Sequence, residues 1–271
     1  MARPRSPALR EALEPMRIKV PTRGNRCLEG FLDAANADEQ LKAWWYVAQV
    51  NATRLRMSDH SWIHIQIVTN IALRLFRLLN RRGVEPDLVR IHGMRPVDAE
   101  VVIAAGCLLH DVGMSIHRTD HEAYSLFLAA DKLGELLGGI YDEPERSVIA
   151  AEAMHAVIAH RRRGDPLTVE AGIVRVADAL DMAEGRSRVP FESGRPNIHS
   201  LSAAAIEGVK IEPGKAKAVR IEIEMNNSAG IFQVDELLAT KLRGSGLEEQ
   251  IEVVARIDAE HEKRLVPVFH I

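Results

Sequence analysis

The sequence predicts a mainly α-helical protein with a small α+β appendage at its C-terminal end. Three patterns support this prediction. Between residues 63 and 75 apolar residues recur at four-residue steps, as on one face of a helix. Residues 97–109 are almost continuously apolar, which at that length favours a buried helix over a strand. Residues 219–224 alternate between apolar and charged side chains, as expected of a strand with one buried face.

The first part of the chain is expected to be an irregular arm followed by helices. Residues 1–25 contain four prolines and a basic excess, which predicts a lead-in without regular structure. Residues 38–79 have a helical pattern that is interrupted near Ser58. A polar connector over residues 83–96 then leads into the buried helix at 97–109.

Capping signals predict the next three helices. Thr119 and Glu122 have the spacing of a capping box, so a helix is expected from 120 to 137, where two glycines end it. Pro144 is expected to open a helix that reaches residue 160. Asp165, followed by a proline, predicts an N-cap and a helix that continues to residue 181.

The composition changes after about residue 185. Strands are predicted at residues 205–211, 218–225 and 250–257, with a helix at 232–242 between the second and third. We therefore divide the chain into an arm and lead-in (1–36), a helical domain (37–185) and a small α+β domain (186–271). We expect the last of these to contribute to a homodimer.

Composition excludes several classes of protein. The formal net charge of −3 and the aromatic content of 4% argue against a protein that coats nucleic acid, so no nucleic-acid partner is expected. The sequence contains no stretch of about 20 apolar residues, so no membrane association is expected either. Only two cysteines are present, and no apolar signal segment is found, which together predict a cytoplasmic protein.

Histidine is concentrated in one part of the chain. Eight of the eleven histidines lie between residues 60 and 160. His110 and Asp111 follow the buried apolar run, where an unpaired imidazole or carboxylate would be costly and a metal ion would supply a partner. Four more residues lie near helix ends or on otherwise apolar helices: His64, His121, His160 and Asp178. Such a set suits manganese, iron, cobalt, nickel or zinc, and magnesium less well.

The order of these residues resembles the HD superfamily of metal-dependent phosphohydrolases. The resemblance covers residues 58–182. It rests on Asp59-His60 with His64 one turn later, on LLHDVG, on His121 followed by Ser125, and on IVRVADALD. It implies an HD-type helical bundle that binds divalent metal.

The resemblance also implies a role for each matching residue. The core metal ligands would be His64, His110, Asp111 and Asp178. His121 and His160 match the additional histidines of HD members with two metal ions, in which the aspartate of the HD pair bridges the ions. HD-GYP phosphodiesterases are similar in this respect, but the GYP signature is absent after His160, so hydrolysis of cyclic di-GMP is not implied. The HD-type domain of exopolyphosphatases is also similar, although that activity is not inferred from the likeness.

Further residues could contact a substrate or support the metal. Arg186, Arg188 and Arg118 could hold a phosphate, since guanidinium suits bidentate phosphate recognition; a solvated surface position is the alternative for each. His117 follows the HD turn and could face the substrate. His60 is either a ligand or part of a solvated helix start, and His155 either supports the metal or packs in the core. Surface positions are expected for the other histidines and for a basic helix end, namely His92, His199, His261, His270 and Arg161–Arg163.

We therefore predict a phosphohydrolase that acts as a phosphatase or a phosphodiesterase. Its water would be activated by one or two divalent metal ions, and two are expected. Asp111 would orient the activated water, and Arg118, Arg186 or Arg188 would stabilise charge on the phosphoryl group. The substrate is expected to be a small phosphorylated molecule of the nucleotide class, because many HD relatives use one. Two alternatives remain open. One is an HD-type di-iron oxygenase, and the other is a regulatory protein that binds metal or nucleotide without turnover.

Overall fold

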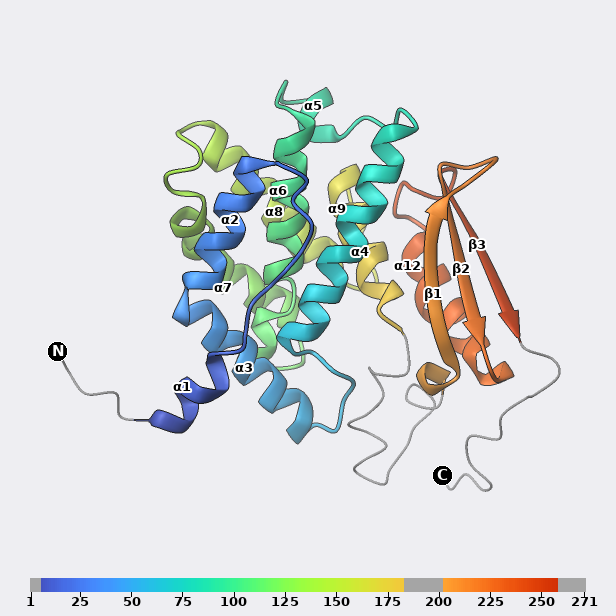
Figure 1. Ribbon diagram of the computed structural model, residues 1–271, viewed down its shortest axis with the longest axis horizontal. Coiled ribbons are helices and arrows are strands. Elements are labelled where there is room, and N and C mark those ends of the chain that lie inside the picture. The colour runs from blue at the N-terminus through green and yellow to red at the C-terminus, as the bar shows by residue number, and fades with distance from the viewer. Residues whose placement is uncertain (1–5, 183–201, 258–271) are drawn as a thin grey trace.

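The computed structural model describes residues 6–182 and 202–257, and it confirms a mainly α fold with a C-terminal α+β appendage (Figure 1). The helices are α1 (Pro7–Leu13), α2 (Arg26–Ala37), α3 (Glu39–Arg54), α4 (Trp62–Arg81), α5 (Asp87–Arg90), α6 (Pro96–Leu109), α7 (His121–Leu137), α8 (Glu145–Ala159) and α9 (Val169–Leu180). A short 3₁₀ turn, η1 (Val112–Ser115), connects α6 to the loop before α7.

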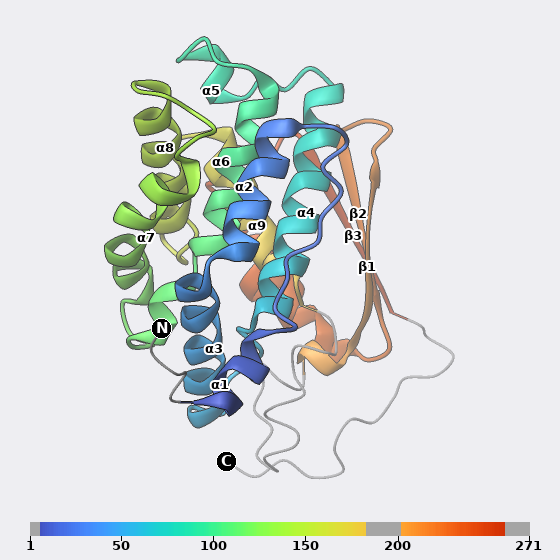
Figure 2. The ribbon, with the colours of Figure 1, turned by 60° about the vertical axis from the view of Figure 1, so that its left-hand side comes forward.

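Helix α6 forms the centre of the helical part. Every residue from Asp98 to Leu109 is buried, as the continuous apolar run predicts. Helices α2, α4, α8 and α9 all contact it (Figure 2). The contact with α8 is close, because a Cβ atom added at Gly106 would lie 2.9 Å from Cβ of Ala156. The polar residues that follow α6 therefore emerge from the interior of the bundle.

Helix α4 is amphipathic, but its buried face differs from the predicted row of residues. Ile63 and Ile67 are 47% and 38% exposed, whereas Ile65 and Val68 are fully buried. A row at four-residue steps drifts by about 40° per step around a helix, so the row begins on the solvent side and ends in the core. This rotation places His64 on the buried side, with no exposed surface.

The starts or caps of four helices differ from the sequence predictions. The lead-in contains α1 and α2, and Leu28 and Phe31 of α2 are fully buried in the core. Residue Asp120 precedes α7 in a left-handed conformation, with φ of 58°, and makes no side-chain cap, so the predicted capping box does not form. Helix α9 begins at Val169 instead of near Asp165, because the hydroxyl of Thr168 accepts the cap hydrogen bond from Ala171 N.

The predicted strands are confirmed as β1 (Ile206–Pro213), β2 (Val219–Met225) and β3 (Ile251–Ile257). The order is β1-β2-β3, with β1 antiparallel and β3 parallel to β2. Between β2 and β3 lie a 3₁₀ turn η3 (Ser228–Gly230), a π-helix η4 (Gln233–Ala239) and the short α12 (Thr240–Leu242). The sheet lies beside α4, and η4 and α12 contact α9 (Figures 1 and 2).

The proposed domain boundary at residue 185 falls within residues 183–201, outside the described residues, and it stays a prediction. Across the described ranges, no helix combines the length and apolar character needed to cross a membrane.

Candidate metal centre

The six residues predicted as metal ligands converge at one end of the helical bundle. They come from five helices or their ends: His64 on α4, His110 and Asp111 after α6, His121 at the start of α7, His160 at the C-cap of α8 and Asp178 in the last turn of α9. All six are buried, with exposed fractions of 9% or less. Polar groups with so little access to water need strong partners.

One group of donor atoms surrounds the Nε2 atom of His110. That atom lies 3.3 Å from Nε2 of His64, 3.2 Å from Oδ2 of Asp111 and 3.9 Å from Oδ1 of Asp178. Nε2 of His64 is in turn 3.5 Å from both carboxylate oxygens. Donors about 2.1 Å from a single ion are about 3.0–3.4 Å apart in tetrahedral or octahedral coordination, so this group fits a transition-metal ion.

A second group of donor atoms faces the other oxygen of Asp111. Its Oδ1 atom lies 3.2 Å from Nε2 of His121 and 3.8 Å from Nε2 of His160. The two oxygens of Asp111 thus face different pairs of histidines. This is the arrangement that a carboxylate shared between two ions requires.

The outer nitrogen of each histidine is held by a hydrogen-bond acceptor. Nδ1 of His64 lies 2.5 Å from Oδ2 of Asp181. Nδ1 of His110 donates to the carbonyl of Cys107 at 2.8 Å, and Nδ1 of His160 donates to the carbonyl of Val157 at 2.6 Å. These two carbonyls belong to the last turns of α6 and α8, where carbonyl groups lack helical partners. A proton on Nδ1 leaves the lone pair of Nε2 directed at the centre, as a metal ligand requires.

The electrostatic environment favours the protonation states that metal ligands need at Asp111 and His160, but at His121 it favours the protonated imidazole. Burial opposes ionisation of Asp111, but the imidazoles of His110, His121 and His64 outweigh it and hold its pKa well below the usual range. Burial, with the charges of His110 and Lys241, lowers the pKa of His160 well below its ordinary value. Burial alone would lower the pKa of His121, but its hydrogen bond to Asp111 raises it. Asp111 is therefore an anion and His160 a neutral imidazole.

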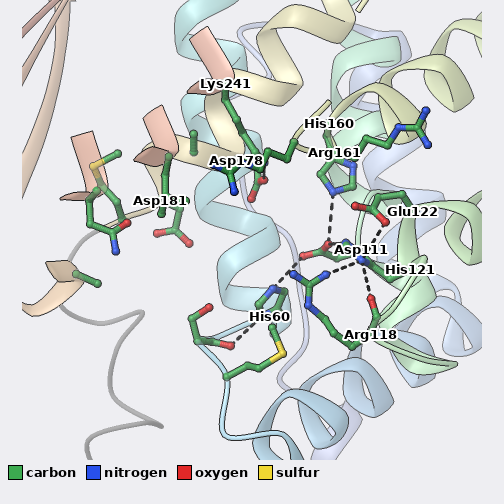
Figure 3. A pocket seen from close by; sticks show the side chains of 18 of the residues that line it. His60, Asp111, Arg118, His121, Glu122, His160, Arg161, Asp178, Asp181 and Lys241 are labelled. Atoms are coloured by element: carbon green, nitrogen blue, oxygen red, sulfur yellow. Dashed lines mark hydrogen bonds and ion pairs between the residues drawn. The ribbon is translucent and has the colours of Figure 1, made fainter. Parts of the chain in front are cut away.

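A cavity of about 480 Å³ opens onto this cluster (Figure 3). That volume lies within the usual range for small-molecule sites. Asp111, His121, His160 and Asp178 reach its wall. Cationic side chains also line it: Arg56, Arg118, Arg161, Arg162 and Lys241. The described lining residues include no phenylalanine, tyrosine or tryptophan.

Four histidines outside the set of six predicted ligands have different surroundings in the structure. His60 is 7% exposed and lines the cavity, with Nε2 4.0 Å from Oδ2 of Asp111, so it is part of the cluster and not of a solvated helix start. His155 lies outside the cluster, where its Nε2 atom accepts a hydrogen bond from Leu167 N at 2.9 Å. His117 is exposed, and its ring forms hydrogen bonds with the backbone of Thr119 in its own turn. His92 is on the surface as predicted.

Of the three arginines predicted to bind phosphate, one lies in the described part of the chain. Arg118 lines the cavity, and its Nη1 atom lies 2.8 Å from Nδ1 of His121 (Figure 3). Arg186 and Arg188 lie outside the described residues, as do His199, His261 and His270. Arg161 is exposed as predicted, but it also lines the cavity.

Asp181 and Lys241 are among the charged residues at the cluster that were not singled out from the sequence. Asp181 follows Asp178 by three residues, a spacing that places both on one side of a helix, so the sequence did carry a signal for it. Lys241 contacts Asp178 from the C-terminal segment, and only the folded chain brings the two together.

Comparisons with known proteins agree with this geometry. A family model of the HD domain matches residues 58–183. An uncharacterised protein of Methanocaldococcus jannaschii is 39% identical over 207 residues, which are 76% of this chain and 80% of that protein. Ribonuclease Y of Desulforamulus reducens is 31% identical over 149 residues, and that of Thermoanaerobacter pseudethanolicus is 29% identical over 167 residues. The matches span only 26% and 29% of the length of these two ribonucleases.

Proposed function

The chain belongs to the HD family, and from this membership we infer that it is a metal-dependent phosphohydrolase with two divalent ions at its centre. The observation that carries the proposal is the position of Asp111. One of its oxygens faces His64 and His110 and the other faces His121 and His160. A single buried carboxylate between two pairs of imidazole nitrogens is suited to sharing by two cations.

The donor set divides between the two proposed ions. His64, His110 and Asp178 would hold one of them, and His121 and His160 would hold the other, with Asp111 common to both. Facing Nε2 lone pairs at 3.3 Å, as in His64 and His110, repel one another unless a cation lies among them. Divalent ions at such a centre activate water for attack and neutralise charge on the phosphoryl oxygens.

The surrounding residues would bind and orient the phosphate. When Nε2 of His121 acts as a ligand, its Nδ1 atom carries the proton and cannot accept a hydrogen bond from Arg118. The guanidinium group beside it then has donors free for a phosphoryl oxygen in the cavity. Arg186 and Arg188 remain proposed for the same role.

The proposed substrate is a small phosphomonoester or phosphodiester of the nucleotide class. The cavity volume of about 480 Å³ supports this size. Four arginines in its wall supply donors for a phosphate, and bound metal ions would offset the carboxylates that also line it. Since no phenylalanine, tyrosine or tryptophan lines the described part of the cavity, recognition would depend on the phosphate more than on the base. A second candidate is an RNA phosphodiester, which the similarity to Ribonuclease Y favours.

A screen of phosphate esters tests the proposal. Purified protein would be supplied with manganese, iron, cobalt, nickel, zinc or magnesium and assayed on p-nitrophenyl phosphate, bis-p-nitrophenyl phosphate, nucleoside monophosphates, cyclic nucleotides and a short RNA. We expect metal-dependent hydrolysis of at least one ester by the wild type and none by Asp111→Asn. Oxygen uptake by the iron(II) form without hydrolysis of any ester would favour the di-iron oxygenase. Tight metal binding with neither activity would favour the regulatory alternative.

We also propose a homodimer formed through the C-terminal sheet. Within the described residues, β3 pairs with β2 on one side only, which leaves its other edge for a second chain. Light scattering of the wild-type protein measures its molar mass in solution, and the mass of a single chain would contradict the homodimer.

A further inference from the structure

One residue beyond the HD domain reaches the centre. Lys241 lies on α12, in the segment that follows β2 and well after residue 183, where the match to the HD family ends. Its Nζ atom donates a hydrogen bond to Oδ2 of Asp178, and Figure 3 shows the two side chains meeting at the wall of the cavity. The C-terminal segment therefore contributes a charged group to the candidate metal centre.

The two oxygens of Asp178 have different surroundings. Oδ1 is the atom that lies 3.5 Å from Nε2 of His64 and 3.9 Å from Nε2 of His110. Oδ2 contacts Lys241. An ion among the imidazoles would thus find one oxygen of Asp178 directed at it, while the other is held by the ammonium group.

The ion pair is shielded from solvent. The side chains of Lys241 and Asp178 are only 17% and 11% exposed. An ion pair at such a position is screened far less than one on the surface, so the ammonium group can hold the carboxylate in one orientation.

The backbone that carries Lys241 is anchored to the helical bundle. The buried guanidinium group of Arg175 on α9 donates to the carbonyl of Lys241 at 2.9 Å. The same group donates to the carbonyl of Arg162 at 2.9 Å, two residues after His160. Close packing adds to this, because a Cβ atom on Gly172 would lie 2.2 Å from the carbonyl oxygen of Ser245. The ammonium group therefore has a defined position.

A π-helix immediately precedes Lys241. Seven residues, Gln233–Ala239, adopt this rare form, in which each hydrogen bond spans five residues. π-Helical segments occur frequently at functional sites, where they shift the side chains that follow them. Three of its residues line the cavity with Lys241, namely Gln233, Glu236 and Leu237.

We propose that Lys241 is a positioning residue of the metal centre. It holds Oδ2 of Asp178 so that this carboxylate offers a single oxygen to the ion, and a coordination position stays open for water and substrate. The C-terminal segment would then be required for catalysis and not for folding alone. This inference rests on the proposed metal centre.

Cobalt(II) binding to the full-length protein tests the role of Lys241 directly. Wild type, Lys241→Met and Lys241→Arg would be titrated with cobalt(II) by calorimetry and visible spectroscopy. The control is Arg243→Met, which removes an exposed cation two residues away. Visible cobalt absorption weakens as the coordination number rises, so the spectrum reports whether the second oxygen of Asp178 has bound.

In Lys241→Met we expect weaker visible absorption and unchanged or tighter cobalt binding, because a cation beside the ion has been removed. Hydrolysis of the best ester should fall by about 10–100-fold, the range found for groups that orient metal ligands. Lys241→Arg and Arg243→Met should match the wild type in the cobalt spectrum.

Two results would overturn the proposal. A wild-type spectrum in Lys241→Met would show that the contact does not position Asp178. Weaker cobalt binding in Lys241→Met, with a lower free energy of unfolding, would assign Lys241 to structural support. If Lys241→Met does not fold, Lys241→Gln is judged by the same criteria. Absence of cobalt binding by the wild type would contradict the proposed function itself, which separates that failure from the failure of this inference.

Discussion

Nδ1 of His64 and Oδ2 of Asp181 lie 2.5 Å apart, and both side chains are buried. This pairing gives His64 a carboxylate partner, whereas His110 and His160 have backbone carbonyls. A carboxylate behind a ligand histidine fixes the ring orientation and raises the basicity of the nitrogen that faces the ion. Asp181 therefore supports the centre although it is not among the predicted ligands.

Removal of this carboxylate should weaken metal binding. We expect Asp181→Ala to lower the affinity for manganese(II) by about 10–100-fold, since the ring of His64 loses its orienting partner. Calorimetric titration of the purified variant measures the change. Asp131→Ala, at an exposed position on α7, is the matched control and should bind as the wild type does. Equal affinities in both variants would show that Asp181 has no part in holding the ligand.

The number of ions depends on His121 and His160. If both contribute to a second site, saturated wild type should contain two manganese ions per chain and His121→Ala about one, because the ligands around His110 are unchanged. Elemental analysis after removal of free metal gives the ratio. One ion per chain in both proteins would restrict the centre to His64, His110, Asp111 and Asp178.

The centre was more predictable from the sequence than the helix starts. His110 and Asp111 end a run of apolar residues. Because a buried helix end leaves such groups without water, the sequence itself indicates that they need a partner. Helix α2 also had a readable pattern, since Leu28, Phe31, Leu32 and Ala35 have helical spacing and are buried, but the prolines of the arm obscured it. The conformation of Asp120 at the N-cap could not be predicted from the sequence, because its left-handed backbone depends on the turn that precedes α7.

The contribution of the C-terminal segment could not be predicted. The alternation of β2 indicates a strand, but it carries no information on which helix the sheet will cover. Lys241 is separated from Asp178 by 63 residues, and an ordinary lysine on a short helix has no local signal for a metal centre. Only the packing of α12 on α9, through Arg175 and Gly172, brings the two charges together.

Arg175 is expected to be important for stability. It is 3% exposed, and its guanidinium group donates to five backbone carbonyls, those of Ala159, Arg161, Arg162, Thr240 and Lys241. Arg175→Met keeps an unbranched apolar stem but leaves these acceptors without their donor. We expect the free energy of unfolding to fall by about 3 kcal/mol, since each buried polar group left unsatisfied costs about 1–3 kcal/mol.

Urea denaturation followed by circular dichroism measures this loss. Arg243→Met is the control, because Arg243 is exposed and a surface substitution of this kind changes stability by less than about 0.5 kcal/mol. Equal midpoints for the two variants would show that the carbonyls find other partners, and that the C-terminal segment does not depend on Arg175.

The last prediction separates metal binding from substrate binding. Asp111→Ala removes both oxygens that face the histidines, so metal affinity and hydrolysis should fall together, and excess metal should not restore turnover. Arg118→Met should behave differently, because Arg118 lines the cavity and supplies no donor atom to the cluster. Loss of one such donor to a developing charge costs about 10²–10³-fold in rate, so hydrolysis should fall by that factor at unchanged metal content.

Arg188→Met and Arg186→Ala, outside the described residues, can be measured in parallel, with Arg243→Met as the control. Metal stoichiometry and phosphate release are determined on the same preparations. Full activity in Asp111→Ala would place the hydrolytic centre elsewhere, whereas loss of metal in Arg118→Met would mean that this arginine acts by supporting His121, 2.8 Å away, and not by binding the phosphate.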